Sequence, residues 1–97
     1  MSMAIVNSIM SHFPRGFTQM TGAYQYVDLG DGVKFRFKGS KAANLVIIRL
    51  TARDTYDVEF YKMAKLSHEQ VAVVTDVYGD QLRTVFEQMT KLRVSLF

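Results

Sequence analysis

The side chains best suited to binding a ligand lie in one basic segment of the chain. Residues 32–53 contain six basic residues and no acidic one, whereas the rest of the chain has six basic and nine acidic residues. Lys34, Arg36 and Lys38 recur at every second position, the spacing that turns side chains to one face of a strand, and Lys41 follows them. Such a concentration of positive charge attracts polyanions, so the segment predicts contact with phosphate groups.

Aromatic residues near these cations supply the second component of a nucleic-acid site. Tyr24 and Tyr26 precede the basic strand, and aromatic rings on a sheet stack on unpaired bases for about 1 to 3 kcal/mol each. Cations beside the rings follow the phosphates of the same nucleic-acid strand. The predicted site for single-stranded DNA or RNA comprises Tyr24, Tyr26, Lys34, Arg36, Lys38, Lys41 and Arg53.

The same residues have a second interpretation, which the sequence leaves open. A sheet face in contact with water carries charged side chains for solubility alone, and its cations would pair with Asp57 and Glu59 across the sheet. Charged side chains also keep an exposed strand from aggregating. The basic face is then a solvated surface without a ligand.

Motifs for catalysis, metal binding or cofactor binding are not found in the sequence. Residues 30–32, Gly-Asp-Gly, precede a strand, whereas a phosphate-binding glycine loop opens a helix, so we interpret them as a turn. His12 and His68 have no second histidine or cysteine at ligand spacing, and the serines lie in no nucleophile motif. We therefore predict no enzymatic activity, no bound metal and no cofactor.

A hairpin at residues 44–62 is the predicted centre of the sheet that positions the basic face. Residues 45–51 are rich in β-branched and large apolar side chains, and residues 56–61 alternate apolar with acidic ones. A loop with an odd number of residues, such as 52–54, places the apolar side chains of both strands on one face. A loop with an even number of residues would place apolar side chains opposite acidic ones. The odd loop predicts the cross-strand pairs Leu50 with Tyr56, Ile48 with Val58, Val46 with Phe60 and Arg49 with Asp57.

The opposite face of this hairpin is only partly polar. It carries Leu45, Ile47, Arg49, Asp57, Glu59 and Tyr61. The apolar members predict a central strand covered on both sides or a face that meets a partner. With the apolar end of the chain included, the candidates for a dimer or partner surface are Leu45, Ile47, Tyr61, Leu96 and Phe97.

The other elements follow from apolar periodicity and turn residues. In the N-terminal half, Phe17 and Met20 are predicted to anchor a connector to the core, and Pro14 ends the helix before it. The predicted elements there are a helix at 3–13, the connector at 17–23, strands at 24–29 and 33–38 and a loop at 39–43.

The C-terminal half is predicted as a loop at 63–69, a last strand at 70–75 and a helix at 77–91 with Asp76 as its cap. Because apolar residues recur three and four apart along this helix, one side of it must cover the sheet. That stripe consists of Tyr78, Leu82, Val85, Phe86 and Met89.

Together these elements predict one domain, residues 1–97, with an α+β fold. An antiparallel twisted sheet of four to five strands carries the N-terminal and the C-terminal helix mainly on one face. The sequence has no cysteine, no leader pattern and no apolar run of the ~20 residues that a membrane span requires. We therefore expect a soluble, unprocessed protein with no membrane partner.

Three blocks of the sequence resemble a group of short uncharacterised proteins of tailed bacteriophages. The blocks are Phe17-Thr18-Gln19-Met20-Thr21-Gly22-Ala23, Thr55-Tyr56-Asp57-Val58-Glu59-Phe60, and Val77-Tyr78-Gly79-Asp80-Gln81-Leu82-Arg83 with Val85-Phe86. The similarity spans most of the chain and departs at Gly79, where alanine is usual, and at Lys91, where a glycine usually ends the helix.

The resemblance implies a viral protein that acts in the host cytoplasm, and it implies no functional residues. The favoured prediction in that setting is the nucleic-acid binding module described above. The alternative is a protein interaction module that inhibits or redirects a host protein, or a homo-oligomeric structural protein such as a homodimer. Small size and the lack of catalytic motifs suit both predictions.

Overall fold

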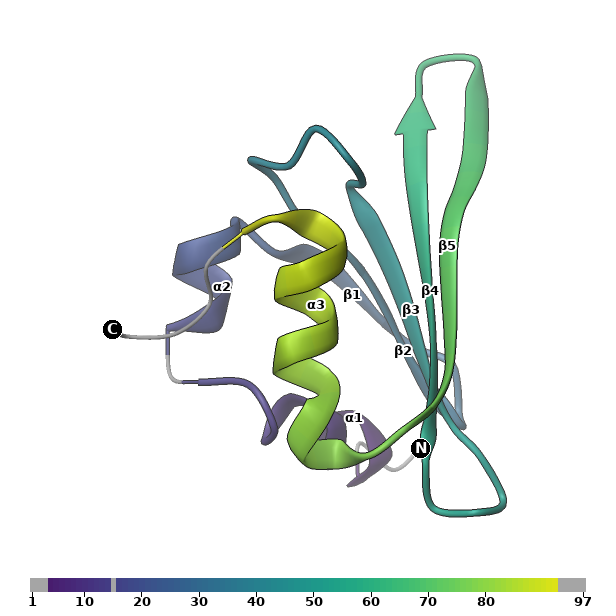
Figure 1. The fold of residues 1–97 in the computed structure, drawn as a ribbon. Helices are drawn as coiled ribbons and strands as arrows, with labels where there is room; N and C mark the ends of the chain where they lie inside the picture. Colours follow the sequence, from purple (N-terminus) through teal and green to yellow (C-terminus); the bar gives the residue numbers. More distant parts are fainter. Residues whose placement is uncertain (1–3, 15, 93–97) are drawn as a thin grey trace.

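The computed structural model describes residues 4–14 and 16–92 and confirms the predicted α+β class. Five antiparallel strands form one sheet in the order β1-β2-β3-β4-β5, and the helices lie on one of its faces (Figure 1). In chain order the elements are α1 (Ala4–Met10), α2 (Phe17–Thr21), β1 (Tyr24–Asp28), β2 (Gly32–Arg36), β3 (Leu45–Leu50), β4 (Tyr56–Ala64), β5 (Ser67–Val77), the 3-10 helix η1 (Gly79–Gln81) and α3 (Leu82–Thr90).

The β3–β4 hairpin has the predicted register. Leu50 pairs with Tyr56, Ile48 with Val58, Val46 with Phe60 and Arg49 with Asp57. Its loop has three residues, because the Thr51 N–H donates a hydrogen bond to the Thr55 carbonyl at 2.9 Å. Asp54 adopts φ 61°, as is typical of three-residue hairpin loops that end in a left-handed residue. The odd loop therefore buries the apolar face, as predicted.

The core lies between this apolar face and the helices. Phe86 of α3 is its centre, with ring centroids of Phe13, Phe17, Phe37 and Phe60 between 5.0 and 6.2 Å away. Phe86 and Phe60 are 1% and 0% exposed, respectively. Tilted and edge-on ring pairs of this kind add stabilisation beyond the burial of apolar area. The segment that follows α1, together with α2 and α3, is thus held to the sheet through one aromatic cluster.

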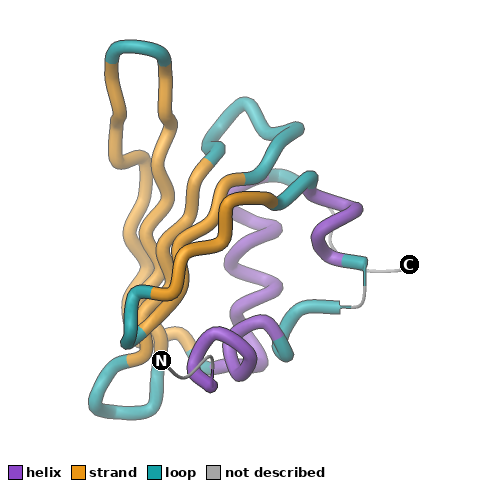
Figure 2. Tube along the Cα trace, turned by 180° about the vertical axis from the view of Figure 1, so that it is seen from behind, coloured by secondary structure: helices purple, strands orange, loops and turns teal. Residues whose placement is uncertain are grey.

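The predicted loop at residues 63–69 is wrong, and the last strand is longer than predicted. β4 continues to Ala64 and β5 begins at Ser67, so His68 lies on a strand opposite Met63. Figure 2 shows this hairpin projecting past the ends of the other strands. Residues 64–71 are exposed, so backbone hydrogen bonds hold the extension together and no apolar alternation marks it in the sequence.

The start of the last helix also differs from the prediction. Asp76 does not cap a helix: it belongs to β5, at φ 55°, where the pairing with β4 shifts register. Because the strand continues to Val77, α3 begins only at Leu82, and Tyr78 lies outside the buried stripe with 61% of its surface exposed. At the other end of the chain the predicted connector at 17–23 contains the helix α2, whose Phe17 is buried as expected.

The residue that ends α3, Lys91, adopts a backbone conformation that is unfavourable for a residue with a side chain. Lys91 stands at the C-cap with φ 64° and donates its N–H to the Glu87 carbonyl at 2.8 Å. A side chain costs roughly 1 to 2 kcal/mol in this left-handed conformation, which glycine adopts freely.

Replacing Lys91 by glycine should therefore stabilise the protein. We expect Lys91→Gly to raise the free energy of unfolding by about 1 kcal/mol. Glycine removes the strain of the left-handed conformation, and this gain is larger than the loss caused by the higher conformational entropy of the unfolded chain. For a domain of this size that corresponds to a melting temperature about 4 to 8 °C higher. Thermal unfolding followed by circular dichroism measures it. Lys91→Ala, which removes the charge but keeps the Cβ, is the control, and an equal gain in both variants would refute the explanation.

Candidate functional site

The basic residues of β2 lie on the face of the sheet that points away from the helices. Lys34 is paired across the sheet with Ile47, and Arg36 with Leu45. Both cations are half-buried, and within the described residues neither forms an ion pair. Their charges are therefore open to an anion from outside the protein.

The acidic residues that were expected to neutralise this face have other partners. The Asp76 N–H donates to Asp57 at 3.4 Å, and the Tyr61 hydroxyl donates to Glu59 at 2.6 Å. Two effects raise the pKa of the Tyr61 phenol above its ordinary value of 10.0. The larger is the hydrogen bond to Glu59, and the smaller is partial burial. Arg49 pairs with Asp31 at 2.8 Å and not with Asp57. The outer face is thus basic toward β1 and acidic toward β5.

Tyr24 and Tyr26 are separated by a bulge in β1. Gln25 has φ 56°, and the pairing shifts so that Tyr24 lies opposite Arg36 and Val27 opposite Lys34. The Tyr26 ring stacks on Phe35 at 5.0 Å, and its hydroxyl is 2.8 Å from that of Thr18, so it lies on the helix side. The prediction that Tyr26 belongs to the basic face is wrong, because it assumed a regular strand.

The other predicted site residues divide between the two ends of the sheet. Lys38 lies beside Tyr24, with Nζ 5.1 Å from the ring centroid, a cation–π contact. Lys41 lines a shallow pocket near the end of α3 together with Lys91. Arg53 occupies the β3–β4 turn, at the far end of the sheet from Lys38. Arg53 therefore cannot act together with the cations of β2.

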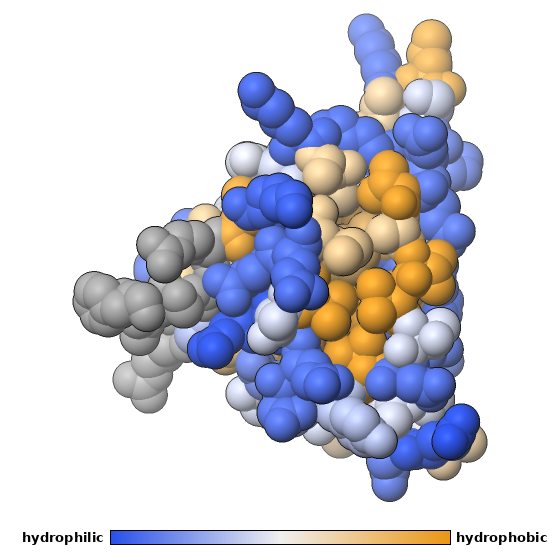
Figure 3. All heavy atoms as spheres, viewed as in Figure 1, coloured by the Kyte–Doolittle hydropathy of each residue, from blue (hydrophilic) through white to orange (hydrophobic). Residues whose placement is uncertain are grey.

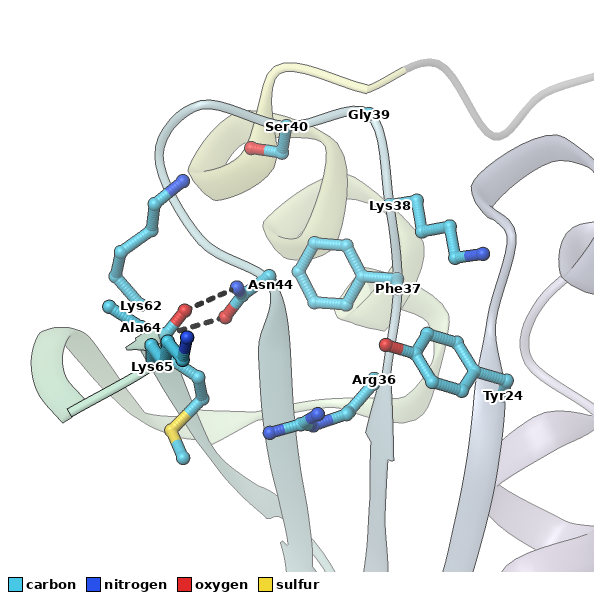
Figure 4. Close-up of a pocket in the computed structure, with 11 residues that line it drawn as sticks. Tyr24, Arg36, Phe37, Lys38, Gly39, Ser40, Asn44, Lys62, Ala64 and Lys65 are labelled. Atoms are coloured by element: carbon cyan, nitrogen blue, oxygen red, sulfur yellow. Dashed lines mark hydrogen bonds between the residues drawn. The ribbon is translucent and has the colours of Figure 1, made fainter. Parts of the chain in front are cut away.

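A pocket of about 530 Å³ lies at the end of the sheet where β2 ends and β3 begins (Figure 4). The loop after β2 and the projecting part of the β4–β5 hairpin flank it. Arg36, Lys38, Lys62 and Lys65 contribute its charged lining, and no acidic side chain of the described residues lines it. Tyr24 stands at its edge. Within the described residues, four basic side chains and no acidic one therefore give this pocket a positive lining.

Lys62 and Lys65 were missed in the sequence because they lie outside the acid-free segment. Antiparallel pairing of β2 with β3 and of β3 with β4 brings Arg36, Leu45 and Tyr61 into one row. The residue after Tyr61 therefore lies beside the end of β2. The topology of three consecutive antiparallel strands was sufficient to find Lys62, whereas Lys65 was concealed by the wrong prediction of a loop.

Hydrogen bonds hold the walls of the pocket in place. The Asn44 amide group donates to the Met63 carbonyl at 2.8 Å, and the Met63 N–H donates to Asn44 Oδ1 at 2.7 Å. Ser40 Oγ donates to the Thr90 carbonyl at 2.7 Å, which ties the flanking loop to α3. These bonds fix the loop and the hairpin relative to each other, so the pocket is largely pre-organised.

The predicted partner surface is only partly available. Leu45 is 8% exposed, so its side chain is already buried within the monomer. Ile47 is half-buried, Tyr61 is hydrogen-bonded to Glu59 and Gln70, and Leu96 and Phe97 lie outside the described residues. The exposed apolar side chains lie elsewhere and include Leu66 at 96%, Val73 at 49% and Val71 at 41%.

Comparison with known protein families, curated proteins and solved structures found no match to this chain. In residues 4–14 and 16–92, no three histidine, aspartate or glutamate side chains gather as metal ligands. No helix of these residues has the length and apolar character needed to cross a membrane. The function is therefore argued from the charge and shape of the outer face and the basic pocket.

Proposed function

We propose that the protein is a non-enzymatic module that binds single-stranded nucleic acid through the basic end of its sheet. The observation that carries the proposal is a set of cations, Lys34, Arg36 and Lys38, that form no ion pair within the described residues, with the exposed ring of Tyr24 beside Arg36 and Lys38. Cations bind the phosphates, and the ring offers a stacking surface for a base. No base-specific hydrogen bond is required, so we expect little sequence preference.

The binding energy in this proposal comes mainly from counterion release. Each phosphate contact to a single strand contributes about 0.7 to the slope of log affinity against log salt concentration. Four contacts therefore give a slope of about −3. The resemblance to short phage proteins supports the further proposal that the protein acts in the cytoplasm of an infected host.

Reversing charge on the basic face should abolish most of the affinity. Fluorescence anisotropy with a labelled oligonucleotide of about 16 nucleotides, at about 50 and 200 mM salt, measures the effect. We expect Arg36→Glu/Lys38→Glu to weaken binding at least about tenfold, which is about 1.4 kcal/mol or more. Arg53→Glu/Arg83→Glu is the matched control, because it reverses two charges away from the face, one in the β3–β4 turn and one on α3. No binding by the unmodified protein at the lower salt concentration would reject the function.

A second candidate function is supported by a different surface. Apolar side chains gather beside α3, over β4 and β5 (Figure 3), and include the partly buried Ala72 and Val74 of β5. In the described chain no strand pairs with the outer edge of β5. A free edge of 11 residues beside an apolar strip suits pairing with a second copy or with a strand of another protein.

The homodimer form of this alternative predicts a mass twice that of the chain in light scattering. Because a charged side chain on an edge strand opposes edge-to-edge pairing, Val73→Lys should return the dimer to a monomer. Val27→Lys, on the opposite edge strand β1, should leave it unchanged. A monomer at every protein concentration tested would count against the dimer.

A further inference from the structure

We infer that the basic pocket receives one unpaired nucleotide of the bound strand, with its phosphate held between β2 and the β4–β5 hairpin. This inference rests on the proposed function and adds to it a pair of binding residues, Lys62 and Lys65, and a preference for single strands over duplexes. Four observations support it: the basic side chains on both walls, the hydrogen-bonded frame, the size of the pocket and the position of Tyr24.

Basic side chains line both walls of the pocket. β2 and β4 flank the beginning of β3, so their backbones are about 10 Å apart. Arg36 comes from one wall, and Lys62 and Lys65 from the other. Lys62 extends toward the loop after β2 and Arg36 toward β3, so cations border the pocket on two sides. The guanidinium of Arg36 offers paired N–H groups that match two phosphate oxygens.

The two walls are also fixed before any ligand binds. Asn44 forms the floor, and its side chain bonds to both the N–H and the carbonyl of Met63, one residue beyond Lys62. The opposite loop is tied to α3 through Ser40. The basic side chains therefore project from a rigid frame, so less ordering of the backbone opposes binding.

The size of the pocket favours an unpaired nucleotide. Its volume of about 530 Å³ lies within the range of small-ligand sites, about 300 to 1,000 Å³. A duplex, whose major groove alone is about 12 Å wide, is too broad to enter. The projecting β4–β5 hairpin also hinders a rigid duplex from lying flat across the end of the sheet. A flexible single strand turns one nucleotide into the pocket without breaking a base pair.

Tyr24 gives the base of that nucleotide a contact. It lines the pocket, is 37% exposed and lies next to Lys38, whose Nζ is 5.1 Å from the ring centroid. In Figure 4 Arg36 extends toward the β3–β4 side of the pocket, whereas Lys38 extends over Tyr24. Because Tyr24 lies opposite Arg36 across β1 and β2, a phosphate near Arg36 has beside it an aromatic surface on which a base stacks.

Binding of the same oligonucleotide as a single strand and as a duplex tests the inference. The protein should bind the single strand at least about tenfold more tightly than the duplex. Lys62→Gln/Lys65→Gln should weaken single-strand binding about tenfold and reduce the salt slope by about 1.4, the value of two phosphate contacts. Tyr24→Leu should weaken it by about 5- to 150-fold and leave duplex binding unchanged.

Matched variants separate loss of charge from loss of structure. Lys62→Arg/Lys65→Arg keeps both charges and should bind like the unmodified protein, whereas Arg53→Gln/Arg83→Gln removes two charges away from the pocket and should change little. If Lys62→Gln/Lys65→Gln binds normally while Arg36→Glu/Lys38→Glu does not, the basic face is functional but the pocket is not its binding site. Equal affinity for duplex and single strand likewise overturns the inference. Absence of any binding overturns the proposed function itself.

Discussion

The register of the β3–β4 hairpin is the constraint on which the rest of the structure depends. Its three-residue loop puts Ile48 and Val58 toward Phe86 and turns Arg49 and Asp57 to the outer face. A shift of one residue would reverse every side chain of one strand, and would press charged groups against the aromatic cluster. The same register brings the Asn44 N–H to the Tyr61 carbonyl at 2.9 Å. The wall that carries Lys62 is thereby placed beside the end of β2.

Much of this arrangement was predictable from the sequence because it follows from regular alternation. The hairpin pairs, the basic and apolar faces of β2 and the buried Phe86 all obey a period of 2 or 3.6. Each failure came from an irregularity. One extra residue at Gln25 sent Tyr26 to the helix side, and the left-handed Asp76 kept β5 extended beyond the expected helix start. The sequence gives no reliable sign of such a bulge unless the residue with positive φ is a glycine.

The candidate site was predictable only in part, and for a related reason. The cations of β2 were found because they are close in sequence, whereas Lys62 and Lys65 join them only through the topology of the sheet. The exposed β4–β5 extension carries little apolar pattern, so its pairing had to come from structure. Charge separation along the chain therefore indicated this end of the sheet but only two of the four basic residues that line the pocket, Arg36 and Lys38.

The outer face has a charge gradient that supports binding at one end. The acidic residues of β4 are engaged by Tyr61, Gln70 and the backbone of β5, while the basic residues near the pocket have no acidic partner in the described chain. Exposed ion pairs such as Arg49 with Asp31 contribute little to stability. A polyanion approaching this face is therefore attracted to the end of the sheet that carries the pocket.

The most direct test is a map of backbone amide shifts in NMR spectra as a short single-stranded oligonucleotide is added. If the basic end of the sheet binds nucleic acid, the signals of Tyr24, residues 36–40 and residues 62–65 should move together and saturate. The signals of the β3–β4 turn around Arg53 should stay in place. Shifts confined to β5 and the strip beside α3, or to the turn at Arg53, would contradict the proposed site, and unchanged spectra would contradict nucleic-acid binding altogether.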